Sequence, residues 1–110
     1  MAEDVGNTRL QAVARSMKLE WSAAALADLN RFALFLQDRH PRLAAIVAQE
    51  ILSKTEVLQA HPQLGHPVGR DGRYRQVVLE VLRAQYVFRY RIAGDRIVMM
   101  RVWHGREQRE

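Results

Sequence analysis

Residues 85–104, QYVFRYRIAGDRIVMMRVWH, decide the fold class. Their first part, residues 85–92, places apolar side chains at every second position, at Tyr86, Phe88, Tyr90 and Ile92. This period of two predicts a strand with one apolar face. Residues 93–95, Ala-Gly-Asp, are typical of a hairpin turn, and residues 96–104 predict the returning strand. The stretch therefore predicts a β-hairpin whose second face carries arginines.

The residues upstream extend this hairpin into a sheet. Residues 74–82 are rich in β-branched side chains and predict a further strand. Residues 61–72 contain two prolines and three glycines, which predict a loop without regular structure. Residues 17–21 alternate between apolar and charged side chains and predict a short first strand.

Two helices are predicted between the first strand and this loop. The first covers residues 23–39, with Ser22 as its N-cap. Its apolar stripe recurs at three- and four-residue steps, at Leu26, Leu29, Phe32 and Leu36. Three charged residues fall outside this stripe, namely Asp28, Arg31 and Asp38. The helix ends before Pro41, which begins a second helix that runs to about residue 60. The short connection predicts an antiparallel helical hairpin.

The order of elements predicts an α+β fold of the type β-α-α-β-β-β. In this fold the N-terminal helical hairpin packs on one face of a mainly antiparallel four-stranded sheet. The arginine-bearing face is expected to be open to solvent or to a partner. A chain of 110 residues has room for one domain. We assign that domain to residues 17–110 and interpret residues 1–16 as an N-terminal extension, non-native or flexible.

The composition excludes several classes of protein. The chain has no cysteine, so disulfides, thiolate nucleophiles and cysteine-bound metals are excluded. No apolar run approaches the roughly 20 residues that span a bilayer, and no export signal is visible, so we expect a cytoplasmic protein without membrane contact. No nucleotide-binding or metalloprotease motif occurs, and His61 and His66 lack a carboxylate at ligand spacing. We expect neither a metal nor a cofactor.

The charge is distributed unevenly along the chain. The formal net charge is +5, and residues 61–110 supply all of it, with ten arginines, five acidic residues and no lysine. Guanidinium groups suit phosphates and carboxylates, so this half predicts an anionic partner such as nucleic acid, a ribosome or an acidic protein segment. The alternative is a basic surface that only keeps the protein soluble.

The candidate site residues follow from this charge. Arginines beside an aromatic side chain are typical of a surface that binds phosphates or stacked bases. We expect the target-binding residues to be Arg70, Arg73, Arg89, Arg91, Arg101, Trp103 and Arg106. In the alternative, the strand arginines pair with Glu80 and Asp95 as ordinary surface charges. His104 is the one plausible proton shuttle at the end of a strand, although such a histidine is more often structural.

Three stretches of the chain resemble the RelE/ParE toxin family. They are KLEWS at residues 18–22 with Ala27-Asp28-Leu29, LQAHPQLG at residues 58–65, and the series RYRQ, YVFRYRI and WHGR within residues 73–106. The resemblance covers roughly residues 17–106. It implies the small toxin of a bacterial type II toxin–antitoxin pair, neutralised by a cognate antitoxin, with the fold predicted above.

The resemblance leaves the target open. RelE-like members cut messenger RNA on the ribosome, with several basic residues, often lysines, and in a metal-independent reaction. A site of that kind would use His104, Arg73 and Arg89 here. The sheet half has no lysine, however, and Gly105 follows His104 where some ribosome-dependent members have an aromatic residue. ParE-like members poison DNA gyrase by binding, and the loop at residues 61–65 and the ending His-Gly-Arg favour that reading. The third alternative is an autonomous nucleic-acid-binding module.

Overall fold

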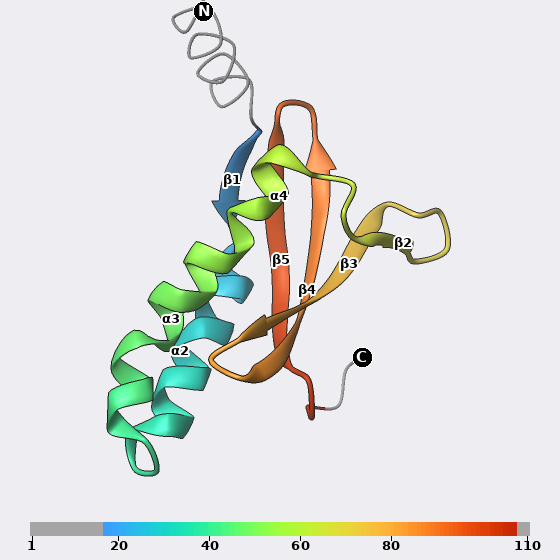
Figure 1. Ribbon diagram of the computed structural model, residues 1–110. Helices are drawn as coiled ribbons and strands as arrows, with labels where there is room; N and C mark the ends of the chain where they lie inside the picture. Colours follow the sequence, from blue (N-terminus) through green and yellow to red (C-terminus); the bar gives the residue numbers. More distant parts are fainter. Residues whose placement is uncertain (1–16, 108–110) are drawn as a thin grey trace, which may run out of the picture.

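The computed structural model describes residues 17–107, in which two long helices cover one face of a five-stranded sheet (Figure 1). The strand order is β1-β5-β4-β3-β2. The strands are β1 (Lys18–Trp21), β2 (His66–Val68), β3 (Tyr74–Val81), β4 (Ala84–Ala93) and β5 (Arg96–His104). The helices are α2 (Ala23–Gln37), α3 (Pro41–Thr55) and the short α4 (Val57–Ala60). None of the helices in this described part is long and apolar enough to cross a membrane.

The hairpin predicted from residues 85–104 is confirmed as β4 and β5. These strands pair antiparallel, as do β3 and β4, whereas β1 joins the edge of β5 in parallel. The register shifts once: Arg89 lies opposite Arg101, but Tyr90 lies opposite Met99, so Met100 is an extra residue on β5. The α+β class and the mainly antiparallel sheet are therefore confirmed.

The sheet has five strands, so the prediction of four was wrong. The additional strand, β2, lies within the predicted loop and pairs with residues 74–76 of β3. Pro67 in its centre is tolerated because an edge strand leaves one side without ladder bonds. Tertiary contacts hold the preceding residues: the buried Tyr90 hydroxyl donates to Pro62 O at 2.7 Å and accepts from Gly65 N at 2.9 Å. A Cβ atom at Gly65 would lie 2.8 Å from that hydroxyl, so the approach requires glycine.

The helical hairpin is confirmed, with one difference. Ser22 caps α2 through a hydrogen bond that its side chain accepts from Ala25 N, and Pro41 begins α3. The predicted second helix is interrupted at residue 56, between α3 and α4. Just before the break, the buried Thr55 hydroxyl donates to Leu52 O at 2.9 Å, a local bond of the kind that bends helices.

The predicted stripe of α2 is confirmed at Leu29, Phe32 and Leu36 and differs in its first turn. The buried residues of the helix are Ala25, Asp28, Leu29 and Phe32, whereas Leu26 is 51% exposed. Asp28, which sequence reasoning left outside the stripe, has only 2% of its surface exposed. Asp28 faces inward because α2 packs along β5, where the Asp28 carboxylate accepts a hydrogen bond from the backbone N–H of Val102.

Candidate functional site

The edge of β5 changes partner half-way along. The pairing with β1 ends at Met99, and the start of α2 continues it. Ser22 Oγ donates to Met100 O at 3.1 Å, and Asp28 Oδ2 accepts from Val102 N at 2.8 Å. Two side chains from the first turns of α2 thus replace a strand and fix α2 against the C-terminal half of β5.

Asp28 also organises a network of ion pairs. Arg101 donates to both of its oxygens, at 2.9 Å and 3.2 Å, and Arg31 donates to Oδ1. Arg31 in turn donates to both oxygens of Glu107, at 3.1 Å and 3.0 Å. Burial by itself raises the pKa of Asp28, but the hydrogen bonds from Arg101, Val102 N and Arg31 outweigh it, so the pKa is lowered. Asp28 is therefore held as a charged carboxylate.

Arg89, Arg101 and Trp103 meet on the face of the sheet that the helices leave uncovered. We call them, together with Gln76, the open-face cluster. Val87 and Trp103 are buried but lie outside the core that packs under the helices. The guanidinium carbons of Arg89 and Arg101 stand 5.0 Å and 5.2 Å from the centre of the Trp103 ring.

Contacts with Gln76, Asp28 and Trp103 let these two arginines lie opposite each other. Gln76 accepts from Arg89 at 3.0 Å, Asp28 neutralises Arg101, and the Trp103 ring attracts both cations. Trp103 itself is only 6% exposed, so it acts as the base of the cluster and not as a free stacking surface. Arg89 and Arg101 are partly exposed, and guanidinium groups are suited to acidic or phosphate-bearing surfaces.

His104 points to the other side of the sheet. Its ring packs edge-on against the buried Tyr86, with 5.2 Å between ring centres, on the side where the helices lie. Its Nδ1 accepts from Arg106 N at 3.2 Å, and its backbone N donates to Glu107 Oε1 at 2.7 Å. Between them, Gly105 N donates to Gln85 O at 2.7 Å; a Cβ at Gly105 would lie 2.8 Å from that oxygen. The turn after β5 is thus fixed, and it requires glycine.

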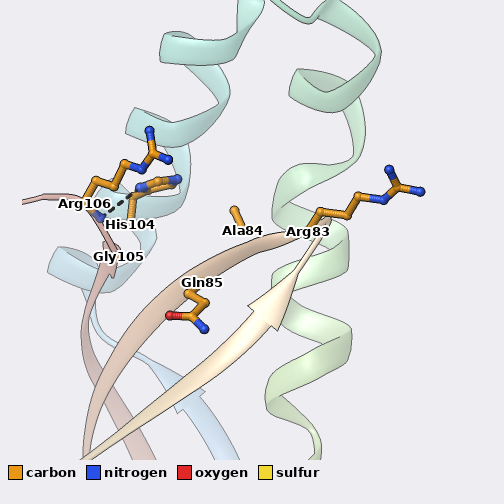
Figure 2. A pocket seen from close by; sticks show the side chains of 6 residues that line it. All are labelled: Arg83, Ala84, Gln85, His104, Gly105 and Arg106. Atoms are coloured by element: carbon orange, nitrogen blue, oxygen red, sulfur yellow. Dashed lines mark hydrogen bonds between the residues drawn. The ribbon is translucent and has the colours of Figure 1, made fainter.

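A hollow of about 360 Å³ lies beside this turn (Figure 2). It is lined by residues of the β3–β4 turn and of the turn after β5, namely Arg83, Ala84, Gln85, His104, Gly105 and Arg106. No acidic residue lines it. Within residues 17–107, no group of three or more histidine, aspartate or glutamate side chains could hold a metal ion.

The structure brings together only part of the predicted binding set. Arg70 and Arg73 are exposed in the β2–β3 connection, where Arg73 pairs with Asp71 at 3.3 Å. Arg91 is exposed beyond the register shift of β4, and Arg106 is exposed in the turn after β5. Only Arg89, Arg101 and Trp103 are therefore in contact.

The acid that sequence reasoning missed is Asp28. The alternative reading paired the strand arginines with Glu80 and Asp95, but Asp95 pairs with Arg96 and Arg101 pairs with Asp28. A signal was present in the sequence, because Asp28 lies at helical spacing within the apolar series Ala25, Leu29, Phe32. A charged residue in such a series indicates a buried pair.

Comparison with known proteins identifies the family. The model of the ParE toxin of type II toxin–antitoxin systems matches residues 19–109. The chain belongs to this family. The resemblance to RelE/ParE toxins is thereby confirmed, and membership implies a cognate antitoxin as a partner.

Individual relatives agree with this assignment. Toxin RelE1 of Caulobacter vibrioides is 34% identical over 88 residues, which are 80% of this chain and 92% of the relative. Toxin RelE3 of the same organism is 30% identical over 91 residues, 83% of this chain and 97% of the relative. Among solved structures, a chromosomal ParDE system from P. aeruginosa has a TM-score of 0.67 at 25% identity, covering 82% of this chain and 97% of the other.

Proposed function

We propose that this toxin inhibits growth by binding DNA gyrase through the open-face cluster, and that it does not cleave RNA. The observation that carries the proposal is the position of His104. Arg89 lies on the uncovered face of the sheet, whereas His104, on the neighbouring strand, packs against the core under the helices. Arg73 lies in the β2–β3 connection. The three residues that a nuclease would need are thus dispersed.

RNA cleavage by the 2′-hydroxyl requires a base within hydrogen-bond reach of that hydroxyl and cations around the same phosphate. The His104 Nδ1 already accepts a hydrogen bond from Arg106 N, so in the neutral ring the proton resides on the other nitrogen. The nitrogen that carries the lone pair is therefore engaged within the turn after β5. An inhibitor that acts by binding needs neither group.

The comparisons support this proposal in part. The matching family and the solved P. aeruginosa relative carry the name ParE, which favours gyrase. The two Caulobacter relatives carry the name RelE, which favours the ribosome-dependent nuclease as the second candidate. Both targets are in the cytoplasm, and we place the toxin there as part of the same proposal.

The proposal is tested by assaying the purified chain on both targets. We expect the chain to block supercoiling of relaxed plasmid by gyrase and to leave translation in a cell-free extract unchanged. Arg89→Ala should weaken inhibition at least tenfold, corresponding to roughly 1.4 kcal/mol lost from a charged contact. His104→Ala should retain inhibition. Arg42→Ala serves as the matched control, because it removes an exposed arginine from the start of α3.

The opposite pattern would establish the nuclease instead. A translation block with intact supercoiling, abolished by His104→Ala, would overturn the gyrase proposal. Arg101→Ala is unsuitable for this test, because it also breaks the ion pairs of Asp28 and would confuse binding with folding.

A further inference from the structure

We propose that the hollow beside His104 binds a phosphate ester, with His104 and Arg106 on one rim and Arg83 on the other. The hollow lies toward the helices, away from the open-face cluster, and the proposal holds whichever target the toxin has. Figure 2 shows His104 and Arg106 together on one side, Arg83 on the opposite side, and Ala84 between them.

Within residues 17–107, no acidic side chain cancels the charge of the hollow. Arg83 and Arg106 are both exposed, and neither has an ion-pair partner among residues 17–107. Arg31, Arg96 and Arg101, in contrast, each pair with an acid. The acid closest in sequence to Arg106 is Glu107, and its carboxylate is held by Arg31 and by His104 N. In Figure 2 the Arg83 side chain extends away from Ala84 at the margin of the hollow, where its cation adds to the positive field that attracts an anion.

His104 adds a directed donor to this charge. Its Nδ1 is occupied by Arg106 N, which leaves the Nε2–H to donate. In Figure 2 the second ring nitrogen lies on the side of the ring that faces Ala84. The edge-on contact with Tyr86 and the bond to Arg106 N hold the ring in this orientation.

The backbone that carries Arg83 is strained. Leu82 and Arg83 connect β3 to β4 with φ angles of +51° and +66°, in the left-handed region. A two-residue hairpin turn with both residues in this region favours asparagine and glycine. Leu82 is explained by its packing against the core, but Arg83 is exposed. A charged side chain kept where glycine would relieve strain indicates that the side chain is used.

The arrangement fits phosphate better than carboxylate. A carboxylate presents two oxygens in one plane, whereas a phosphate presents oxygens in several directions and so accepts from donors on opposite rims. A hollow of about 360 Å³ also exceeds a single ion and lies within the range of small-molecule sites, roughly 300–1,000 Å³. The hollow has room for a phosphate bound to a larger group, and the proposed ligand is such an ester, supplied by a free nucleotide or by a nucleic-acid backbone.

The experiment titrates the full-length chain with inorganic phosphate, AMP and an eight-residue oligothymidylate, following backbone amide signals by NMR. We expect saturable shifts confined to residues 83–85 and 104–106. Arg106→Ala and Arg83→Ala should each weaken AMP binding roughly fivefold to tenfold, the range of a partly exposed charged hydrogen bond. Arg42→Ala should change it less than twofold. Tighter binding of the oligothymidylate than of AMP would identify nucleic acid as the source of the phosphate, and the reverse would identify a nucleotide.

The strain provides a second, independent readout. Arg83→Gly should raise Tm by a few degrees, because glycine adopts the turn without strain, and should weaken AMP binding as much as Arg83→Ala does. Shifts that are spread over arginines throughout the surface would overturn the proposal, as would equal weakening by Arg42→Ala. Tighter binding of hexaglutamate than of AMP would show that the site takes carboxylates, and would overturn the phosphate assignment.

Discussion

Replacing Asp28 should destabilise this toxin more than replacing any surface acid. In the Asp28→Ala variant, Val102 N loses its acceptor, and Arg101 and Arg31 lose their shared carboxylate. An unsatisfied buried N–H costs about 1–3 kcal/mol, and breaking a buried ion pair costs about 3–5 kcal/mol. The two arginine side chains are 43% and 41% exposed, so water partly replaces the lost bonds. We therefore expect a loss of about 2–4 kcal/mol.

Urea denaturation of the purified chain at pH 7 measures this loss through the transition midpoint. Glu20→Ala is the matched control, because Glu20 forms an ion pair with Arg96 at 3.0 Å in which both side chains are nearly half exposed. Removing this exposed ion pair should lower the free energy of unfolding by less than about 1 kcal/mol. Equal losses for the two variants, or a loss below about 0.5 kcal/mol for Asp28→Ala, would refute the view that Asp28 joins α2 to β5.

Three further predictions concern Asp28, Tyr90 and Gly105. The folded state lowers the pKa of Asp28 below its ordinary value of 3.8. The stabilising contribution of Asp28 is therefore complete above pH 3.8 and is lost as the pH falls through the lower pKa of the folded state. The urea midpoint should consequently fall less steeply with acid in Asp28→Asn than in the natural chain. Tyr90→Phe should cost about 1–3 kcal/mol and speed hydrogen exchange at Gly65 N, because that amide loses its acceptor; an unchanged exchange rate would contradict this role of Tyr90. Gly105→Ala should lower Tm, at a cost of about 1–3 kcal/mol, since the new Cβ meets Gln85 O at 2.8 Å; an unchanged Tm would mean that the turn after β5 can move.

Local patterns determined most of the fold. The period of two in residues 85–92 specified one strand and its apolar face, because alternation along a strand is a property of the backbone itself, and the turn residues 93–95 specified the returning strand. Ser22 and Pro41 marked the starts of α2 and α3 for an equally local reason, namely their hydrogen-bonding and φ preferences. The position of Arg89 opposite Arg101, in contrast, depends on the extra residue Met100 in β5, because the uninterrupted hairpin register would place Arg89 opposite Met100.

Only the tertiary structure decided the contacts between residues that are far apart in the chain. β2 exists because β3 and Tyr90 hold a proline-rich segment in place, and its own sequence reads as loop. The helical spacing indicates that Asp28 is buried, but only the packing of α2 along β5 shows its partner, by bringing Arg101, 73 residues away, to its carboxylate. The separation of His104 from Arg89 likewise depends on the sheet having one covered face. Such pairings are set by packing and by the need to satisfy buried polar groups, and no periodicity along the chain encodes them.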